Sequence, residues 1–136
     1  MRTLPTPQVN CRALARDAGD GCYALQFELG LDGGAPLALP GFDPFVGFEL
    51  LATADGRPLA VHQPALDLPL HARTLQLAPG AVLTLHTPIR LCFAPDAPPS
   101  DQGLVWTIAH ARAGVALQVR LGLSAPFDGL VPLQFV

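Results

Sequence analysis

The clearest pattern along this chain is a strict alternation of apolar and polar side chains. Between Tyr23 and Leu31 every second residue is apolar, and a second run of this kind extends from Val115 to Leu123. A period of two is typical of a β-strand that turns one face toward a core. We expect these two segments to anchor the core sheets.

Shorter apolar segments lie between turn signals such as Asp-Gly and Pro-Gly. Their spacing of roughly 8–12 residues predicts an all-β fold, an immunoglobulin-like antiparallel β-sandwich of about 7–9 strands. Pro88 indicates a sheet edge or a bulge, and 62–72 is interpreted as a loop that crosses between sheets. The shorter expected strands are 36–39, 42–53, 58–61, 74–77, 81–87, 89–93 and 104–109.

The two ends of the chain carry weaker patterns. We expect residues 1–136 to form one domain in which 1–20 is partly irregular, and 11–18 fits either one short helical turn or irregular structure. The apolar segment 125–136 is expected to be a terminal strand, packed either on the body of the domain or on a partner.

Three stretches follow an order that resembles two known families: LQFELGLDGGAPLALPG, then FELLATADGRPL, then LQLAPGAVLTL. This order is similar to the immunoglobulin-like accessory domain of deuterolysin-type zinc peptidases and to the bacterial intracellular proteinase inhibitor family. The resemblance covers about Tyr23 to Leu85 and implies a β-sandwich with an accessory or inhibitory role. The HExxH motif of the peptidases is absent from the sequence, so the resemblance implies no peptidase activity.

Charge narrows the range of partners. The net charge is −3 and the eight basic residues, all Arg, are scattered, so we predict no nucleic-acid partner. The sequence contains no run of 18 apolar residues, so we predict no membrane span. The first 18 residues also lack the apolar core of a signal peptide. We therefore expect a cytoplasmic protein.

Charged residues are scarce, at 14% of the chain, where soluble domains typically have roughly 25%. Either a second copy or another protein covers part of the surface, or the composition is biased for reasons unrelated to function. The sequence leaves these two explanations open.

Three cysteines, Cys11, Cys22 and Cys92, make an odd number. We expect buried or half-buried thiols in a reducing compartment. If the protein is exported, a disulfide between Cys11 and Cys22 is an alternative that the sequence leaves open. Cys92, beside Arg90, is the candidate for an activated thiol.

Catalytic and metal-binding patterns are weak, so we predict no catalytic residue, no metal site and no cofactor. No two of the four histidines stand two or four residues apart, although His62, His71 and His86 could converge across strands. Glu28 and Glu49, the only two Glu, are expected on solvated sheet faces rather than as an acid–base pair.

The candidate contact site is the aromatic segment around Phe42, Asp43 and Phe45. Phe42 and Phe45 are either exposed anchors for a partner or ligand, or they plug the open end of the sandwich, which is the interpretation we favour. Phe48 and Trp106 fit the strand alternation and are expected in the core.

The leading functional hypothesis is a non-enzymatic protein-interaction or accessory module, with a homo-oligomer such as a dimer among its expected forms. The alternative is a β-sandwich that binds a small ligand or a carbohydrate, because aromatic side chains beside Asp43 suit sugar stacking. A third hypothesis is an enzyme whose site is assembled across strands.

Overall fold

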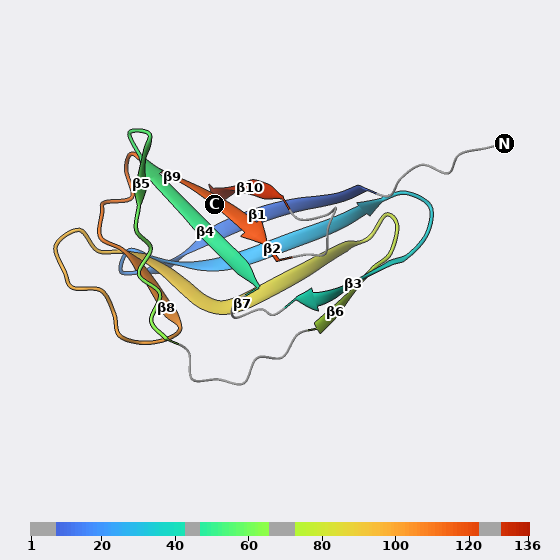
Figure 1. Ribbon diagram of the computed structural model, residues 1–136, viewed down its shortest axis with the longest axis horizontal. Coiled ribbons are helices and arrows are strands. Elements are labelled where there is room, and N and C mark those ends of the chain that lie inside the picture. Colours follow the sequence, from blue (N-terminus) through green and yellow to red (C-terminus); the bar gives the residue numbers. More distant parts are fainter. Residues whose placement is uncertain (1–7, 43–46, 66–72, 123–128) are drawn as a thin grey trace.

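The computed structural model describes residues 8–42, 47–65, 73–122 and 129–136, and all of its regular elements are β-strands (Figure 1). The expected all-β class is confirmed, with slightly more strands than the expected 7–9. The ten strands are β1 (Gln8–Gly19), β2 (Cys22–Asp32), β3 (Leu37–Phe42), β4 (Phe48–Ala54), β5 (Arg57–Leu59), β6 (Arg73–Leu77), β7 (Val82–Phe93), β8 (Val105–Ile108), β9 (Val115–Leu121) and β10 (Leu130–Phe135).

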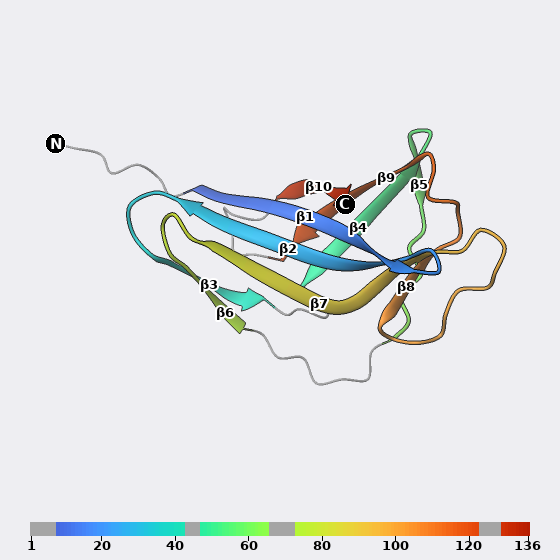
Figure 2. The same cartoon turned by 180° about the vertical axis from the view of Figure 1, so that it is seen from behind.

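Eight strands form one sheet in the order β5-β4-β9-β10-β1-β2-β7-β8. The two outermost strands of this order meet, because His62, just beyond β5, forms an antiparallel bridge with Thr107 of β8. Two backbone hydrogen bonds of 2.7 and 3.0 Å connect these residues. The sheet thus curls into a nearly closed, barrel-like sandwich, whose two layers are seen from opposite sides in Figures 1 and 2.

Most neighbouring strands are antiparallel, as expected, but two pairs are parallel. These are β1 with β10 and β7 with β8. The terminal strand β10 lies between β9 and β1, and Leu133 of β10 is buried. Of the expected terminal segment 125–136, the structure describes residues 129–136. These residues pack on the body of the domain.

The expectation of an irregular start or a helical turn within 1–20 is wrong for residues 8–19, which form a strand of 12 residues. The inward positions of β1 hold small side chains, among them the fully buried Ala13 and Ala15. Because alanine is small and only weakly apolar, it makes an alternation of apolar and polar residues hard to recognise in the sequence. Leu14, on the opposite side, is also buried and obscures the period of two.

Pro88 lies at a bulge, one of the two expected alternatives. Residues Ala24 and Gln26 of β2 pair with Arg90 and His86 of β7, so three residues of β7 stand opposite Leu25 alone. The missing N–H of proline costs no ladder hydrogen bond at a bulge. This allows residues 81–87 and 89–93, expected as two segments, to form the single strand β7 in the interior of the sheet.

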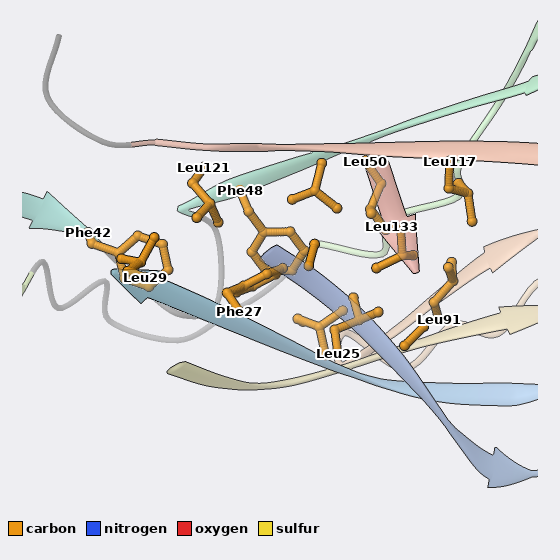
Figure 3. Close-up of a cluster of buried hydrophobic side chains, with 14 of the residues drawn as sticks. Leu25, Phe27, Leu29, Phe42, Phe48, Leu50, Leu91, Leu117, Leu121 and Leu133 are labelled. Atoms are coloured by element: carbon orange, nitrogen blue, oxygen red, sulfur yellow. The ribbon is translucent and has the colours of Figure 1, made fainter. Parts of the chain in front are cut away.

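The core fills the space between the two layers (Figure 3). Phe27 and Phe48 meet at its centre with ring centroids 5.0 Å apart, and Trp106 lies 4.9 Å from Phe48. All three side chains are at most 3% exposed, so the expected core positions of Phe48 and Trp106 are confirmed.

The remaining strands, β3 and β6, form a small antiparallel sheet of their own. It lies beside the end of the barrel where β2 finishes (Figure 1). We call this region the capped end and define it by its buried apolar residues Leu29, Leu31, Leu39, Phe42, Leu75 and Leu77.

Candidate functional site

The candidate contact site predicted from sequence is only partly described. Phe42 is 2% exposed and belongs to the core cluster that Figure 3 draws. A ring this deeply buried closes the barrel and offers no surface to a partner, so an exposed Phe42 anchor is wrong and the plug alternative holds for this residue. Asp43 and Phe45 lie outside the described residues.

A disulfide between Cys22 and Cys92 is a feature that the sequence did not predict. The two cysteines are direct partners across the antiparallel pair β2–β7, with Cα atoms 4.0 Å apart. Each cysteine stands next to an inward residue of its strand, and neighbouring side chains point to opposite faces. The two cysteine side chains therefore point to the outer side of the sheet, where both are half-buried. The expectation of three free thiols is wrong, and Cys92 is not an activated thiol in this state.

The pairing of Cys11 with Cys22 is also wrong, because Cys11 stands opposite Leu29. Leu29 lies seven positions along β2 from Cys22, which is roughly 23 Å at strand spacing. A disulfide tolerates no more than about 7 Å between Cα atoms. Cys11 is free, and burial raises the pKa of its thiol from 9.0 to about 11.

Three half-buried rings gather beside the disulfide. Tyr23 meets Phe93 and Phe135 edge to face, at centroid distances of 5.9 and 4.9 Å. The guanidinium of Arg112 lies 4.8 Å from the Phe135 centroid and 5.7 Å from that of Tyr23. We call this region the disulfide end and define it by Cys22, Cys92, Tyr23, Phe93, Phe135 and Arg112.

The residues considered for catalysis do not converge in the part of the chain that the structure describes. No group of three His, Cys, Asp or Glu side chains there could hold a metal ion. His62 and His86 are exposed, and His71 is outside the described residues, so the alternative in which the three histidines converge is not tested.

The two glutamates lie on different layers of the barrel. Glu28 approaches Arg12 at 3.5 Å, and Glu49 approaches Arg120 at 3.8 Å. Each carboxylate thus faces an arginine of the neighbouring strand and not the other carboxylate. This agrees with solvated sheet faces and leaves no acid–base pair between them.

The outer faces of the two layers differ in charge. The face of β4, β9 and β10 has one ion pair, Glu49–Arg120, and otherwise uncharged side chains. Leu51 and Leu130 on this face are 41% and 42% exposed. We call it the β4–β9–β10 face, and its outward residues are Glu49, Leu51, Thr53, Ala116, Gln118, Arg120, Leu130, Pro132 and Gln134.

The opposite face, on β1, β2 and β7, is more polar. Its outward positions include five charged residues: Arg12, Arg16, Glu28, Asp32 and Arg90.

Each face has a hollow among the described residues. Beside Leu51, a hollow of about 410 Å³ is lined by Thr53, Pro58, Leu59 and Gln118 among others. On the polar face, a hollow of about 280 Å³ is lined by residues that include Asn10, Arg12, Glu28 and Asp32. Asn10 donates a hydrogen bond to Asp32 there, and Arg12 pairs with Glu28, so the polar groups already satisfy one another.

Among the described residues, no helix is long and apolar enough to cross a membrane. Comparisons with protein-family models, with curated proteins and with solved structures each found no match. The resemblance to the peptidase accessory domain and to the proteinase inhibitor family therefore stays a prediction, as does the immunoglobulin-like assignment.

Proposed function

We propose that this protein is a non-enzymatic interaction module that uses the β4–β9–β10 face to bind a second copy of itself. The observation that carries this proposal is the low charge of a broad sheet face on which Leu51 and Leu130 are more than two-fifths exposed. Exposed apolar surface in a setting of uncharged residues is typical of protein contact sites.

The charges on this face favour a second copy over an acidic or a basic partner. Glu49 and Arg120 neutralise each other within one chain, so two such faces meet without net repulsion. An interface between identical copies is self-complementary about a two-fold axis. If the axis passes beside this pair, Arg120 of each copy faces Glu49 of the other.

The size of the face points to weak association. Three strands about 4.8 Å apart and about 24 Å long give roughly 350 Å² per copy. The total of roughly 700 Å² is below the ~1,200 Å² of a stable interface. We therefore expect a dimer that forms only at high protein concentration.

Sedimentation velocity over a range of protein concentrations tests this function. The native chain should shift from monomer to dimer, and Leu51→Arg should remain monomeric because an arginine there loses apolar contact and adds repulsion. Val82→Arg is the matched control, since Val82 is 66% exposed on the opposite layer, and it should dimerise normally. A native chain that stays monomeric up to millimolar concentration, or equal loss in both variants, would contradict the proposal.

A second candidate is the binding of a small polar ligand in the hollow beside Asn10 and Glu28. The sugar-stacking version of this hypothesis loses support, because Phe42 is buried and no aromatic residue lines this hollow. A thermal-shift screen of small amines, acids and sugars tests it. A shift that Glu28→Gln abolishes would support ligand binding, and no shift with any compound would count against it.

The disulfide bears on where such a module works. Disulfides persist in oxidising compartments and are rare in the cytosol. The Cys22–Cys92 bond therefore favours an oxidising compartment over the cytoplasmic location expected from the sequence.

A further inference from the structure

Leu130, the first residue of β10, is an exposed leucine at one border of the β4–β9–β10 face. It stands opposite Arg120 of β9, and Arg120 in turn stands opposite Glu49 of β4. Residues directly opposite each other in antiparallel strands point to the same side of the sheet. Leu130, which is 42% exposed, therefore projects outward at the end of a row that crosses three strands.

The hollow of about 410 Å³ beside Leu51 lies at the other border of this face, next to β5. β5 has three residues and accompanies only the last part of β4, which has seven. The lining of the hollow includes the apolar side chains of Leu50, Leu59 and Val61, and none of the described residues that line it is charged. An uncharged hollow of this size has room for an apolar side chain, since similar volumes hold whole small ligands.

The Glu49–Arg120 ion pair lies between Leu130 and the hollow. Three strand intervals of about 4.8 Å separate β10 from β5, so the leucine and the hollow are roughly 14 Å apart across the sheet. Their midpoint falls between β9 and β4, the two strands that carry the ion pair. A two-fold axis between two such faces, through this midpoint and at right angles to the line that joins the two features, places Leu130 of each copy over the hollow of the other. The same axis passes beside the ion pair, so Arg120 of each copy faces Glu49 of the other.

We propose that Leu130 of each copy inserts into the hollow beside Leu51 of the other copy. This inference rests on the proposed dimer and names the contact that holds it together. Insertion removes the exposed part of Leu130 from water and fills an uncharged hollow, and the two-fold axis repeats this contact twice. It also extends the interface beyond the three strands of the face to β5.

Alanine substitution tests whether Leu130 contributes to the dimer. Leu130→Ala shortens the inserted side chain without adding charge, so the protein concentration at which half of the chains are dimeric should rise at least about five-fold in sedimentation velocity. Leu104→Ala is the matched control, because Leu104 is 38% exposed and precedes β8 in the opposite layer, and it should dimerise like the native chain. Equal behaviour of the two variants would overturn the proposal.

Cross-linking tests where Leu130 inserts. A Leu130→Cys chain is mixed with a Gln63→Cys chain at a concentration at which the native chain is dimeric, and the mixture is mildly oxidised. Both chains also carry Cys11→Ala, which removes the free native thiol. Gln63 is an exposed residue that lines the hollow, so we expect a heterodimer whose disulfide joins positions 130 and 63, identified by mass spectrometry. Val82→Cys, on the opposite layer, replaces Gln63→Cys in the control and should give at least about five-fold less heterodimer, because a disulfide needs Cα atoms within about 7 Å.

The outcomes separate the inserted leucine from the dimer itself. If the native chain dimerises and Leu51→Arg prevents it, but positions 130 and 63 do not link above the control, the dimer face stands and the insertion of Leu130 is wrong. If the native chain stays monomeric, both proposals fail. A dimer that Leu130→Ala weakens and that links position 130 to position 63 supports both.

Discussion

The capped end and the disulfide end close the same barrel by different means. At the capped end, Phe42, Leu39, Leu75 and Leu77 are no more than 6% exposed, so closure depends on removing apolar surface from water. At the disulfide end, Tyr23, Phe93 and Phe135 remain half-buried, and a covalent bond and ring geometry supplement the burial. We infer from this comparison that the disulfide end, which no small sheet covers, depends on its disulfide to hold its strands together.

The largest expected effect is the loss of the cross-link. Replacing both Cys22 and Cys92 with Ala should lower the free energy of unfolding by about 4 kcal/mol, because the bond closes a loop over a sequence separation of 70. Urea denaturation followed by Trp106 fluorescence measures this. Cys11→Ala is the control and should cost about 1 kcal/mol. A double variant that loses less than the control would show that the disulfide end does not need its bond.

The next effect concerns the capped end. Phe42→Ala should cost about 3 kcal/mol, since it removes a fully buried ring and leaves a cavity. Phe135→Ala removes a ring of the same size at the disulfide end but should cost less, under about 2 kcal/mol, because that ring is half-buried. The same urea titrations compare the two. If the two variants lose the same amount of stability, the capped end and the disulfide end do not differ in how much they depend on burial.

The smallest effect belongs to Arg112. Its guanidinium lies over the Phe135 and Tyr23 rings at an exposed position, so Arg112→Ala should cost about 0.5–1 kcal/mol. Arg57→Ala, at an exposed arginine of the β4–β5 hairpin, is the control and should change stability by less than ~0.5 kcal/mol. If Arg112→Ala loses no more stability than this control, the guanidinium does not stabilise the disulfide end.

The sequence predicted strands best where apolar residues are large and regular. The alternation at Tyr23–Leu31 became β2, and the alternation from Val115 became β9, because Leu, Phe and Val at every second position leave no other stable arrangement. It failed at β1, where Ala13 and Ala15 fill the inward positions. Such small side chains give the sequence little apolar contrast, and their full burial is seen only in the assembled barrel.

The candidate sites were less predictable than the strands. Alternation places Glu49 and Arg120 outward, but only the register of β4 against β9 brings them together. The same holds for Cys22 and Cys92, which no local pattern joins. Phe42 illustrates another difficulty, because an aromatic residue beside turn residues fits both an anchor and the favoured plug, and only the small sheet decides between them.

The pairing of β1 with β10 has a consequence for how fast the barrel forms. Ala13 stands opposite Leu133, so the two strands meet across 133 − 13 = 120 positions of sequence. Contacts between such distant segments require a large loss of chain entropy before they stabilise anything, and proteins dominated by them fold in milliseconds to seconds. Until β10 arrives, β1 and β9 each present an open edge that another chain can join. The interval before β10 docks is therefore the time at which this protein is most prone to aggregate.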